Sequence, residues 1–398
     1  MIDVTGQLLI DDALALVLAR VQPLEAEPVP IALAAGRVLA EAATATVDLP
    51  PFDNSAMDGF AVPAADTPGT LRAVGQSAAG KPFDGTLGPG ETVAISTGAV
   101  VPAGADAIVP VEEAQAGADS VVVPAAAAGA HIRRRGGDAA RGALVVAAGS
   151  RLRPAQIGAL AAAGVAVVSA ARRPRVAVLA TGSELRPPGS ALAPGQIYEA
   201  NTPLLAAQLA AAGAVVELLE PVADDADATA AALERGLAAD ALVTSGGVSV
   251  GPHDLVRALL AQLGVEEVFW RVAVRPGRPV AFGVRGRTLV FGLPGNPVSS
   301  LVGCELFVRP AVLALQQATD AGPHYLSGRL GAPVRQDPRR AQLLRARSRS
   351  EADGVVLVTL QGQESHMIAT SAGADALVLI ESGDGELPAG APVRYLTL

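Results

Sequence analysis

The sequence predicts a multidomain protein built around a doubly wound, mostly parallel α/β sheet. Three observations lead to this fold class. The chain has 398 residues, which exceeds the usual size of one domain. Residues 175–318 alternate between apolar runs of strand length and helical patterns, as in doubly wound sheets. Residues 47–135 and 325–398 contain short, Val-rich runs separated by Gly and Pro, which is typical of β domains.

Composition and charge exclude several classes of protein. Hydrophobic residues make up 50% of the chain but aromatic residues only 3%, so we expect cores made of Ala, Val and Leu. A formal net charge of −9 argues against a nucleic-acid partner. The single cysteine, Cys304, is expected in the core and excludes internal disulfides and cysteine-based zinc sites. The acidic N-terminus does not resemble a signal peptide, and residues 154–171 fit a helix followed by a strand, so we expect a cytoplasmic protein without a membrane partner.

The first part of the chain predicts a mainly helical domain that is interrupted by a β domain. Residues 5–21 place apolar side chains on one helical face, and residues 32–39 suggest a second helical segment. Helical signal returns at residues 154–163, where Pro154 occupies a favoured helix-start position. The predicted helical domain consists of residues 1–46 and 140–173, and the inserted β domain spans residues 47–139.

Residues 174–322 are expected to form the α/β domain, and residues 323–398 a compact C-terminal β domain. Apolar strands that alternate with helices indicate a sheet covered on both faces. The expected strands of the α/β domain are residues 176–181, 215–219, 241–244, 268–272, 280–284 and 288–291. The expected helices are residues 202–212, 227–238, 252–263 and 299–318.

Four loops of this domain should lie beyond the carboxyl ends of the strands, where such sheets bind ligands. The loop at residues 245–254 contains glycines and hydroxyl side chains and leads from a strand into a helix. That geometry presents backbone N–H groups to phosphates and other oxyanions. Asp254 adds a carboxylate that could recruit a divalent metal. The other three loops hold Glu184, the pair Asp224 and Asp225, and the turn at residues 292–297.

Arg275 and Arg278 flank a Pro-Gly turn, which should hold the two guanidinium groups in a fixed relation. Arginine suits forked hydrogen bonding to tetrahedral oxyanions, so the domain favours a phosphorylated or oxyanion substrate with a divalent cation. Each feature alone also has a structural explanation, as a tight turn, a helix cap or a surface ion pair. Their expected meeting at one sheet edge favours a shared binding site.

The inserted domain carries its own polar segments, at residues 51–61, 96–106 and 133–138. A pure turn rarely needs so many hydrogen-bonding groups. His131 and His253 match no metal-ligand spacing, and we expect both to be structural or peripheral. No Ser-His-Asp or Cys-His arrangement is evident, which argues against covalent acyl transfer.

These segments together resemble the molybdopterin molybdenumtransferases, the family of MoeA and the gephyrin E-domain. The resemblance covers most of the chain from about residue 5 to 310, in the family's order, and is weaker in the C-terminal region. The matching segments are FDNSAMDGFA, STGAVVPAGADAIV, RRRGGDAARGALVVAAGSRL, TGSEL with PGQIYEAN, TSGGVSVGPHD, WRVAVRPGRPVAFG and GLPGNPVSS.

The resemblance implies an elongated homodimer of four-domain subunits, with a MogA-like α/β domain and a β-barrel-like C-terminal domain. The implied reaction inserts molybdate into adenylylated molybdopterin, requires Mg²⁺ and releases AMP. The implied cleft lies between the α/β domain of one subunit and the inserted domain of the other, since a symmetric dimer brings different patches together. Adenylylated molybdopterin and molybdate are the implied partners, and the resemblance allows a molybdopterin adenylyltransferase as a third.

The resemblance also implies roles for individual positions. Asp224 and Asp254 are the implied Mg²⁺ ligands. The residues at catalytic positions are Asp58, Thr97, Asp138, Glu184, Asp224, Asp254, Arg271, Arg275 and Arg278. The residues at substrate-binding positions are Ser245, Gly246, Gly247, Ser249, Pro294, Gly295, Asn296, Pro297, Arg345 and Ser365. The sequence departs from the family's pattern in having arginine at 271, 275 and 278, where lysine is frequent, Ser183 in place of an acid, and Leu344 in place of an aromatic residue.

No protein nucleophile is obvious, so a water or a molybdate oxygen is expected to attack phosphorus. Two other functions stay open. The chain could be a molybdopterin adenylyltransferase, because the α/β domain is shared with those enzymes. It could also be a non-catalytic assembly scaffold with a vestigial cleft.

Overall fold

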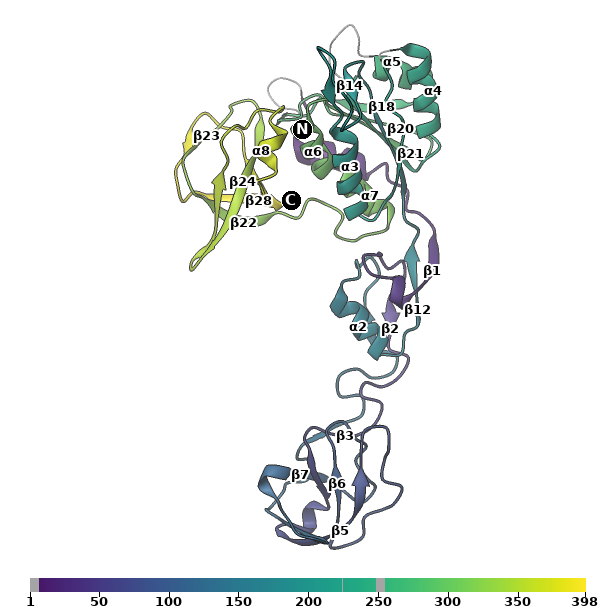
Figure 1. The fold of residues 1–398 in the computed structure, drawn as a ribbon, viewed down its shortest axis with the longest axis vertical. Helices are drawn as coiled ribbons and strands as arrows, with labels where there is room; N and C mark the ends of the chain where they lie inside the picture. The colour runs from purple at the N-terminus through teal and green to yellow at the C-terminus, as the bar shows by residue number, and fades with distance from the viewer. Residues whose placement is uncertain (1–6, 224, 248–254) are drawn as a thin grey trace.

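The protein is elongated, with the α/β domain and the C-terminal domain at one end and the inserted domain at the other (Figure 1). The computed structural model describes residues 7–223, 225–247 and 255–398. A narrow module of short strands and one helix separates the two ends. The chain therefore crosses this module twice, once on the way to the inserted domain and once on the way back.

The centre of the α/β domain is a six-stranded sheet with the order β16-β13-β17-β21-β20-β18. The first four strands of this order are parallel, β20 is antiparallel to β21, and β18 is antiparallel to β20. This confirms the predicted mostly parallel sheet. The strands are β13 (Arg175–Ala180), β16 (Val215–Leu218), β17 (Ala241–Ser245), β18 (Glu266–Trp270), β20 (Ala281–Arg285) and β21 (Thr288–Leu293).

Helices cover both faces of this sheet because successive strand residues are apolar, so that each face is apolar. In β13, Val176 and Val178 face α3 (Asn201–Ala211) and α7 (Arg309–Leu315). Ala177 and Leu179 of the same strand face α4 (Ala226–Gly236) and α5 (Leu255–Gln262). The two apolar clusters confirm the doubly wound arrangement.

The long helix predicted at residues 299–318 is α6 (Pro297–Gly303), the π-helical segment η4 (Cys304–Val308) and α7 in succession. The helix Pro297–Leu315 is long and apolar enough to cross a membrane, but 78% of its most apolar window is buried inside the protein. Cys304 lies in this buried segment, as predicted, and burial raises the pKa of its thiol. Among the described residues no other helix passes this test of length and hydropathy.

The N-terminal region contains less helix than predicted. The first helix, α1 (Ile10–Leu18), is present, but Ile10, Ala13 and Val17 pack into the core of the α/β domain. Residues 32–39 do not form a helix, because Gly36 adopts a φ of 74° and Val38 and Leu39 form β-bridges. Only the short 3₁₀ turn η1 (Ile31–Leu33) is helical there.

The connecting module has its own small core, in which α2 (Pro154–Ala162) packs on paired strands. β1 (Ala26–Pro30) is antiparallel to β12 (Val167–Ala171), and β2 (Ala43–Thr44) to β11 (Leu144–Val146). Because β1 leads away from the α/β domain and β12 leads back, this strand pair forms an arm between the two ends of the molecule (Figure 1).

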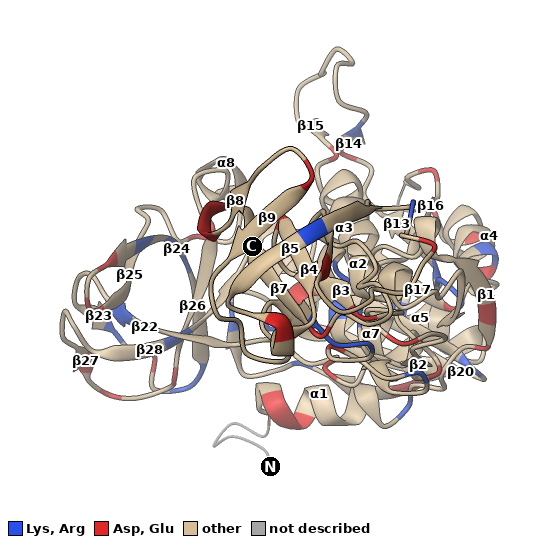
Figure 2. Cartoon of the chain, turned by 90° about the horizontal axis from the view of Figure 1, so that it is seen from below, with Lys and Arg blue, Asp and Glu red and all other residues tan. Residues whose placement is uncertain are grey.

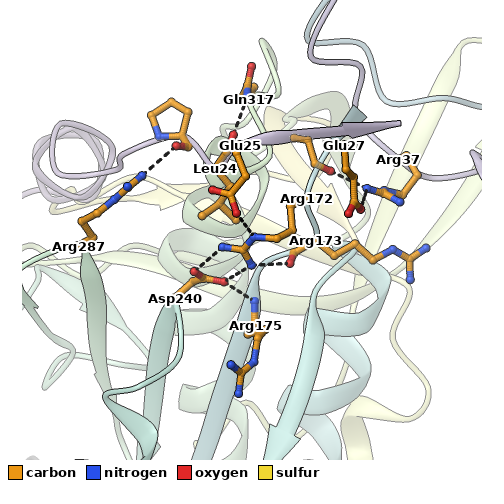
Figure 3. Close-up of polar contacts among 12 residues, drawn as sticks. Leu24, Glu25, Glu27, Arg37, Arg172, Arg173, Arg175, Asp240, Arg287 and Gln317 are labelled. Carbon is orange, nitrogen blue, oxygen red and sulfur yellow. Dashed lines mark hydrogen bonds and ion pairs between the residues drawn. The ribbon is translucent and has the colours of Figure 1, made fainter. Parts of the chain in front are cut away.

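An ion-pair network fixes the base of this arm (Figure 3). Arg172, at the end of β12, donates two hydrogen bonds of 2.9 Å to the carboxylate of Asp240, which precedes β17. Its Nε donates to Glu25, just before β1, at 2.7 Å. We call Glu25, Arg172 and Asp240 the junction cluster. Since its members come from both strands of the arm and from the α/β domain, it ties the arm to the sheet.

The inserted domain is a β domain, as predicted. Its six-stranded sheet has the order β7-β4-β6-β5-β9-β8, and a separate pair, β3 with β10, lies beside it. Two short 3₁₀ turns, η2 (Ala64–Asp66) and η3 (Val111–Glu113), connect its strands. The strands are β3 (Asn54–Ser55), β4 (Gly59–Val62), β5 (Gly69–Ser77), β6 (Glu91–Ile95), β7 (Ala107–Pro110), β8 (Gln115–Ala116), β9 (Ser120–Val123) and β10 (Ile132–Arg133).

The C-terminal domain is a closed barrel of five strands, which confirms the barrel-like prediction. Closure results because β24 pairs with β25 on one side and with β26 on the other. From the α/β domain, β19 (Val274–Arg275) adds to β24 and joins the two domains. The barrel strands are β22 (Leu326–Leu330), β24 (Ala341–Glu351), β25 (Gly354–Thr359), β26 (Ala376–Ile380) and β28 (Pro392–Thr397); β23 (Val334–Arg335) pairs with β27 (Glu386–Leu387), and α8 spans Ile368–Ser371.

Candidate functional site

A cavity of about 470 Å³ opens at the carboxyl ends of β13, β17 and β21, and we call it the edge cavity. Three of the four predicted loops meet there, together with the start of α3 and one residue of the C-terminal domain. The residues that line it are Ala180, Thr181, Glu184, Leu185, Ile197, Tyr198, Glu199, Ala200, Asn201, Ser245, Gly295, Asn296, Pro297 and His366.

Hydrogen bonds hold the loops around the cavity in one arrangement. The side-chain amide of Asn201 donates to Ser245 Oγ and to the carbonyl of Gly295, both at 2.7 Å. Ser300, in α6, donates to the carbonyl of Pro294 at 2.5 Å. The strand end at Ser245 and the Pro-Gly-Asn-Pro turn are therefore fixed to the same helix start.

Gly246 is required by this close approach of loops. It has a φ of 95°, and a Cβ at this position would lie 2.6 Å from the carbonyl oxygen of Thr181. Any other residue would strain the backbone and push the loop after β13 away. The glycine pattern of this loop thus has a packing cause, whatever it binds.

Glu184 and Glu199 bring two carboxylates to the edge cavity. Glu199 is buried and accepts the backbone N–H groups of Asn201 and Thr202, at 2.7 and 2.9 Å, so it caps the start of α3. Glu184 directly precedes β14 (Leu185–Arg186), which pairs with β15 (Ile197–Tyr198), and Figure 2 shows the loop between these two strands extending away from the domain. Glu184 is therefore the lining carboxylate without a role as a helix cap.

The C-terminal domain contributes through the segment at residues 361–371. Ser365 Oγ accepts a hydrogen bond of 2.9 Å from the side-chain amide of Asn296. The carbonyl of Ser365 accepts the backbone N–H of Val298 at 3.1 Å. The segment is thereby held against the Pro-Gly-Asn-Pro turn, and His366 becomes part of the cavity wall.

The position of Arg345 does not match the substrate-binding role that the resemblance implied. Its side chain is fully buried, and the guanidinium donates to backbone carbonyls of the segment at residues 361–371. Burial lowers the pKa of Arg345. The acceptors are Gly362 at 2.6 Å, Glu364 at 3.2 Å, Met367 at 2.5 Å and Ser371 Oγ at 3.1 Å. Arg345 thus shapes the segment that carries Ser365 and does not line the edge cavity.

The three arginines between β18 and β20 do not line the edge cavity either. Arg275 is exposed at the end of β19. Arg278 is exposed, and its Nε donates to Gln7 Oε1 at 3.0 Å. The guanidinium of Arg271 lies 3.7 Å from the ring centre of Trp270. The Pro-Gly turn between Arg275 and Arg278 is present, with Gly277 at a φ of 108°.

The structure brings Asp58 and Thr97 together in the inserted domain. Asp58 Oδ1 accepts the backbone N–H of Thr97 at 2.8 Å. Asp138 lies in the return segment, where its N–H donates to the carbonyl of Leu49 at 2.9 Å. Within one chain the inserted domain, which carries Asp58 and Thr97, lies at the other end of the molecule from the α/β domain (Figure 1).

The implied Mg²⁺ ligands Asp224 and Asp254 lie outside the described residues, and so does Ser249 of the implied substrate-binding positions. Within residues 7–223, 225–247 and 255–398, no group of three or more His, Cys, Asp or Glu side chains is arranged to hold a metal. Asn201 Oδ1 is buried without a hydrogen-bond partner in the wall of the edge cavity. This amide oxygen has lone pairs with which it could coordinate a metal ion.

Sequence reasoning missed Glu199, Asn201 and His366 as parts of this site. The polar pair Glu199 and Asn201 directly before a helix was a usable signal, because helix starts favour acceptors for free N–H groups. The role of His366 depends on how the barrel docks on the α/β domain, and local sequence patterns do not predict that docking.

Comparisons with known protein families cover nearly the whole chain. Residues 8–164 match the MoeA N-terminal region (domain I and II). Residues 177–314 match a probable molybdopterin binding domain. Residues 327–398 match the MoeA C-terminal region (domain IV).

Similar proteins match over the same extent. A protein of Mycobacterium tuberculosis named molybdopterin molybdenumtransferase 2 is 39% identical over 386 residues, which cover 93% of this chain and 94% of that protein. The molybdopterin molybdenumtransferase of Haemophilus influenzae is 33% identical over 380 residues, 93% of each chain.

Solved structures show the same architecture. A crystal structure of a molybdopterin biosynthesis MoeA protein from Pyrococcus horikoshii has a TM-score of 0.81 and 31% identity, covering 98% of this chain and 99% of that one. A second structure of a MoeA protein from that organism has a TM-score of 0.83 at 24% identity.

Proposed function

We propose, because this chain belongs to the MoeA family of molybdopterin molybdenumtransferases, that it inserts molybdate into adenylylated molybdopterin and releases AMP. One observation carries this proposal. Ser245, the Pro294–Pro297 turn and Ser365, which the resemblance assigned to substrate binding, are joined around the edge cavity by hydrogen bonds. Their meeting gives the implied substrate a formed site.

The reaction requires a site for several negative charges, on the pyrophosphate link and on molybdate. The P–O–P bond breaks, AMP leaves, and the other phosphate stays on the pterin. An oxygen of water or of molybdate attacks phosphorus, since no described side chain is arranged as a nucleophile. The backbone N–H of Gly247 and the cations Arg271, Arg275 and Arg278, which lie outside the lining of the edge cavity, would offset the charge that develops.

The residues around the edge cavity fit Mg²⁺. Mg²⁺ binds oxygen ligands, and the wall provides the Glu184 carboxylate and the buried, unpartnered Oδ1 of Asn201. These two, with Asp224 and Asp254, are the residues that would hold it. When bound, the metal supplies charge neutralisation for the pyrophosphate and molybdate oxygens.

We further propose a homodimer in which the inserted domain of one subunit completes the edge cavity of the other. The support is the separation within one chain between the pair Asp58–Thr97 and the cavity. Asp58 is anchored to the backbone of Thr97, so the pair presents a fixed polar surface. A second subunit is the simplest source of that surface at the cavity.

The test is turnover with adenylylated molybdopterin, molybdate and Mg²⁺, measured as AMP release and as activation of a cofactor-free molybdoenzyme. Asp254→Ala and Arg278→Ala should each lower turnover at least tenfold, because each removes a charge that offsets the reacting anions. Asp227→Ala and Arg235→Ala, on the surface of α4, are the matched controls and should retain wild-type turnover.

Near-normal turnover of both test variants would contradict the proposal. The adenylyltransferase alternative is separated by incubating the protein with ATP and molybdopterin but without molybdate. Release of pyrophosphate in that mixture would favour the alternative. A scaffold would bind neither AMP nor molybdate in calorimetry.

A further inference from the structure

Two guanidinium groups lie over the ring of Trp270. The Cζ atom of Arg257, in α5, lies 3.9 Å from the ring centre, and the Cζ atom of Arg271 lies 3.7 Å from it. A cation over an indole ring is attracted by the negative face of the π system, and the contact restrains the long arginine side chain. This is the chain's single tryptophan.

The charges of the two arginines are offset differently. Arg257 forms a forked ion pair with Glu267, with both hydrogen bonds at 2.9 Å. In the described part of the chain, Arg271 has neither an ion pair nor a side-chain hydrogen bond. Its guanidinium is half-buried and held by the ring alone, so its N–H donors remain available to an anion.

The backbone also fixes Arg271. It has a φ of 79°, a conformation that residues other than glycine rarely adopt, and its N–H donates to the carbonyl of Val280 at 2.9 Å. Persistent strain of this kind requires support from the surrounding structure. The hydrogen bond and the Trp270 stack provide that support from the main chain and the side chain respectively.

The register of the sheet places Arg271 at the binding edge. Trp270 is opposite Ala281, Ala281 is opposite Gly292, and Gly292 is opposite Thr244. These four residues form one row across the sheet. Arg271 therefore follows this row at the same edge of the sheet at which Ser245 follows Thr244.

We propose that Trp270 is a positioning residue that holds Arg271 ready to bind a tetrahedral oxyanion at this edge. The proposal rests on the proposed function and deepens it, because the anion would be either the phosphate of the nucleotide or molybdate. Arg257, which is paired with Glu267, makes the second contact with the ring. Glu267 neutralises Arg257, so the net positive charge of the stack belongs to Arg271.

The test is a double-mutant cycle on anion binding, measured by calorimetry with the full-length protein and either AMP or sodium molybdate. Trp270→Leu should weaken binding of the relevant anion about fivefold, as expected for loss of a cation–π contact. Arg271→Gln should weaken it further. In the Arg271→Gln background, Trp270→Leu should have no additional effect, because Trp270 acts through Arg271.

A fluorescence titration gives a readout that a merely structural role of Trp270 would not move. Because Trp270 is the sole tryptophan, binding of the anion to Arg271 should change the emission of the wild-type protein. Arg271→Gln should abolish the anion-dependent change, because the anion then has no cation beside the ring. The anion that produces the change, AMP or molybdate, identifies which substrate the arginine contacts.

Two control variants separate positioning from folding. Trp270→Phe keeps an aromatic face and should restore the affinity to within about twofold of wild type. Tyr325→Leu removes the cation–π contact with Arg394 in another part of the molecule and should leave anion binding unchanged.

Equal weakening by Trp270→Leu in both backgrounds, or no binding of either anion by the wild type, would overturn this inference. If the wild-type protein did not insert molybdenum but the double-mutant cycle still showed coupling between Trp270 and Arg271 in anion binding, only the proposed function would be overturned. If the wild-type protein inserted molybdenum normally but Trp270 and Arg271 showed no coupling in anion binding, only the inference about Trp270 would be overturned.

Discussion

Individual residues of the site act mainly by fixing backbone. Arg345 donates its hydrogen bonds to the segment at residues 361–371, and Glu199 caps α3. Gly246 permits the loop after β17 to contact the loop after β13. The resemblance assigned Arg345 and Gly246 to substrate binding, and sequence reasoning missed Glu199, so none of these structural tasks was predicted. The reason is that each role depends on partners distant in the chain, as when Asn201 joins Ser245 to Gly295.

Replacing Arg345 should destabilise the C-terminal barrel before it affects catalysis directly. Arg345→Met leaves buried carbonyls without donors, which should cost roughly 3 kcal/mol of unfolding free energy. Arg345→Lys should recover part of that loss. Thermal unfolding gives the stability, and limited proteolysis near residues 361–371 shows whether the segment has loosened.

The matched control is Arg349→Met, on the same strand, where the arginine is exposed and pairs with Glu351. It should change the free energy of unfolding by less than about 0.5 kcal/mol. If Arg345→Met were as stable as wild type and only weakened substrate binding, the direct role implied by the resemblance would be correct.

Helices and strands were predictable where burial dictates the pattern. All six strands of the α/β sheet were expected within a few residues, because strands covered on both faces need continuous apolar runs. Residues 32–39 were wrongly expected as a helix, since periodicity does not reveal the left-handed Gly36. The packing of α1 on the α/β domain was also missed. An apolar stripe indicates that a helix packs against another element, but it does not indicate to which domain that element belongs.

The junction cluster should make the attachment of the arm depend on pH. Burial disfavours ionisation of Asp240, but hydrogen bonds from Arg172 and from the N–H of Arg175 outweigh it and lower the pKa of Asp240. A lowered folded-state pKa gives stability that is present above the ordinary value of 3.8 and is lost as the pH falls through the folded value. Asp240→Asn should therefore destabilise the protein by about 2 kcal/mol at pH 7 and by progressively less below pH 4.

Urea unfolding at pH 7, 5 and 3 measures this difference. Glu217→Gln is the control, because it removes a more exposed ion pair, with Arg175, and should change stability little at any of these pH values. A gap between Asp240→Asn and wild type that stayed constant down to pH 3 would show that the charge of Asp240 contributes nothing.

The molecule as a whole separates two sets of polar residues, one in the inserted domain and one at the edge cavity (Figure 1). The separation of domains was predictable from composition shifts along the chain. Its extent was not, because the length of the arm results from the pairing of β1 with β12, which lie far apart in sequence.

Mixing two inactive variants tests whether the site is shared between subunits. Asp58→Ala would damage the inserted domain and Asp254→Ala the α/β domain. Co-expressed at equal levels, they should recover about a quarter of wild-type turnover, because half of the dimers are mixed and each mixed dimer keeps one intact site. Co-expression of Asp58→Ala with Thr97→Ala, both in the inserted domain, is the control and should recover none.

The packing of α1 has a consequence for how the protein is made. Its residues Ile10, Ala13 and Val17 share a core with Val312 and Leu315 of α7, so α1 can complete this core only after α7 has been synthesised. The inserted domain can fold earlier, since domains form as units during synthesis. In the interval the apolar face of α1 is uncovered, and a nascent chain arrested before residue 297 should therefore bind chaperones through Ile10–Leu18.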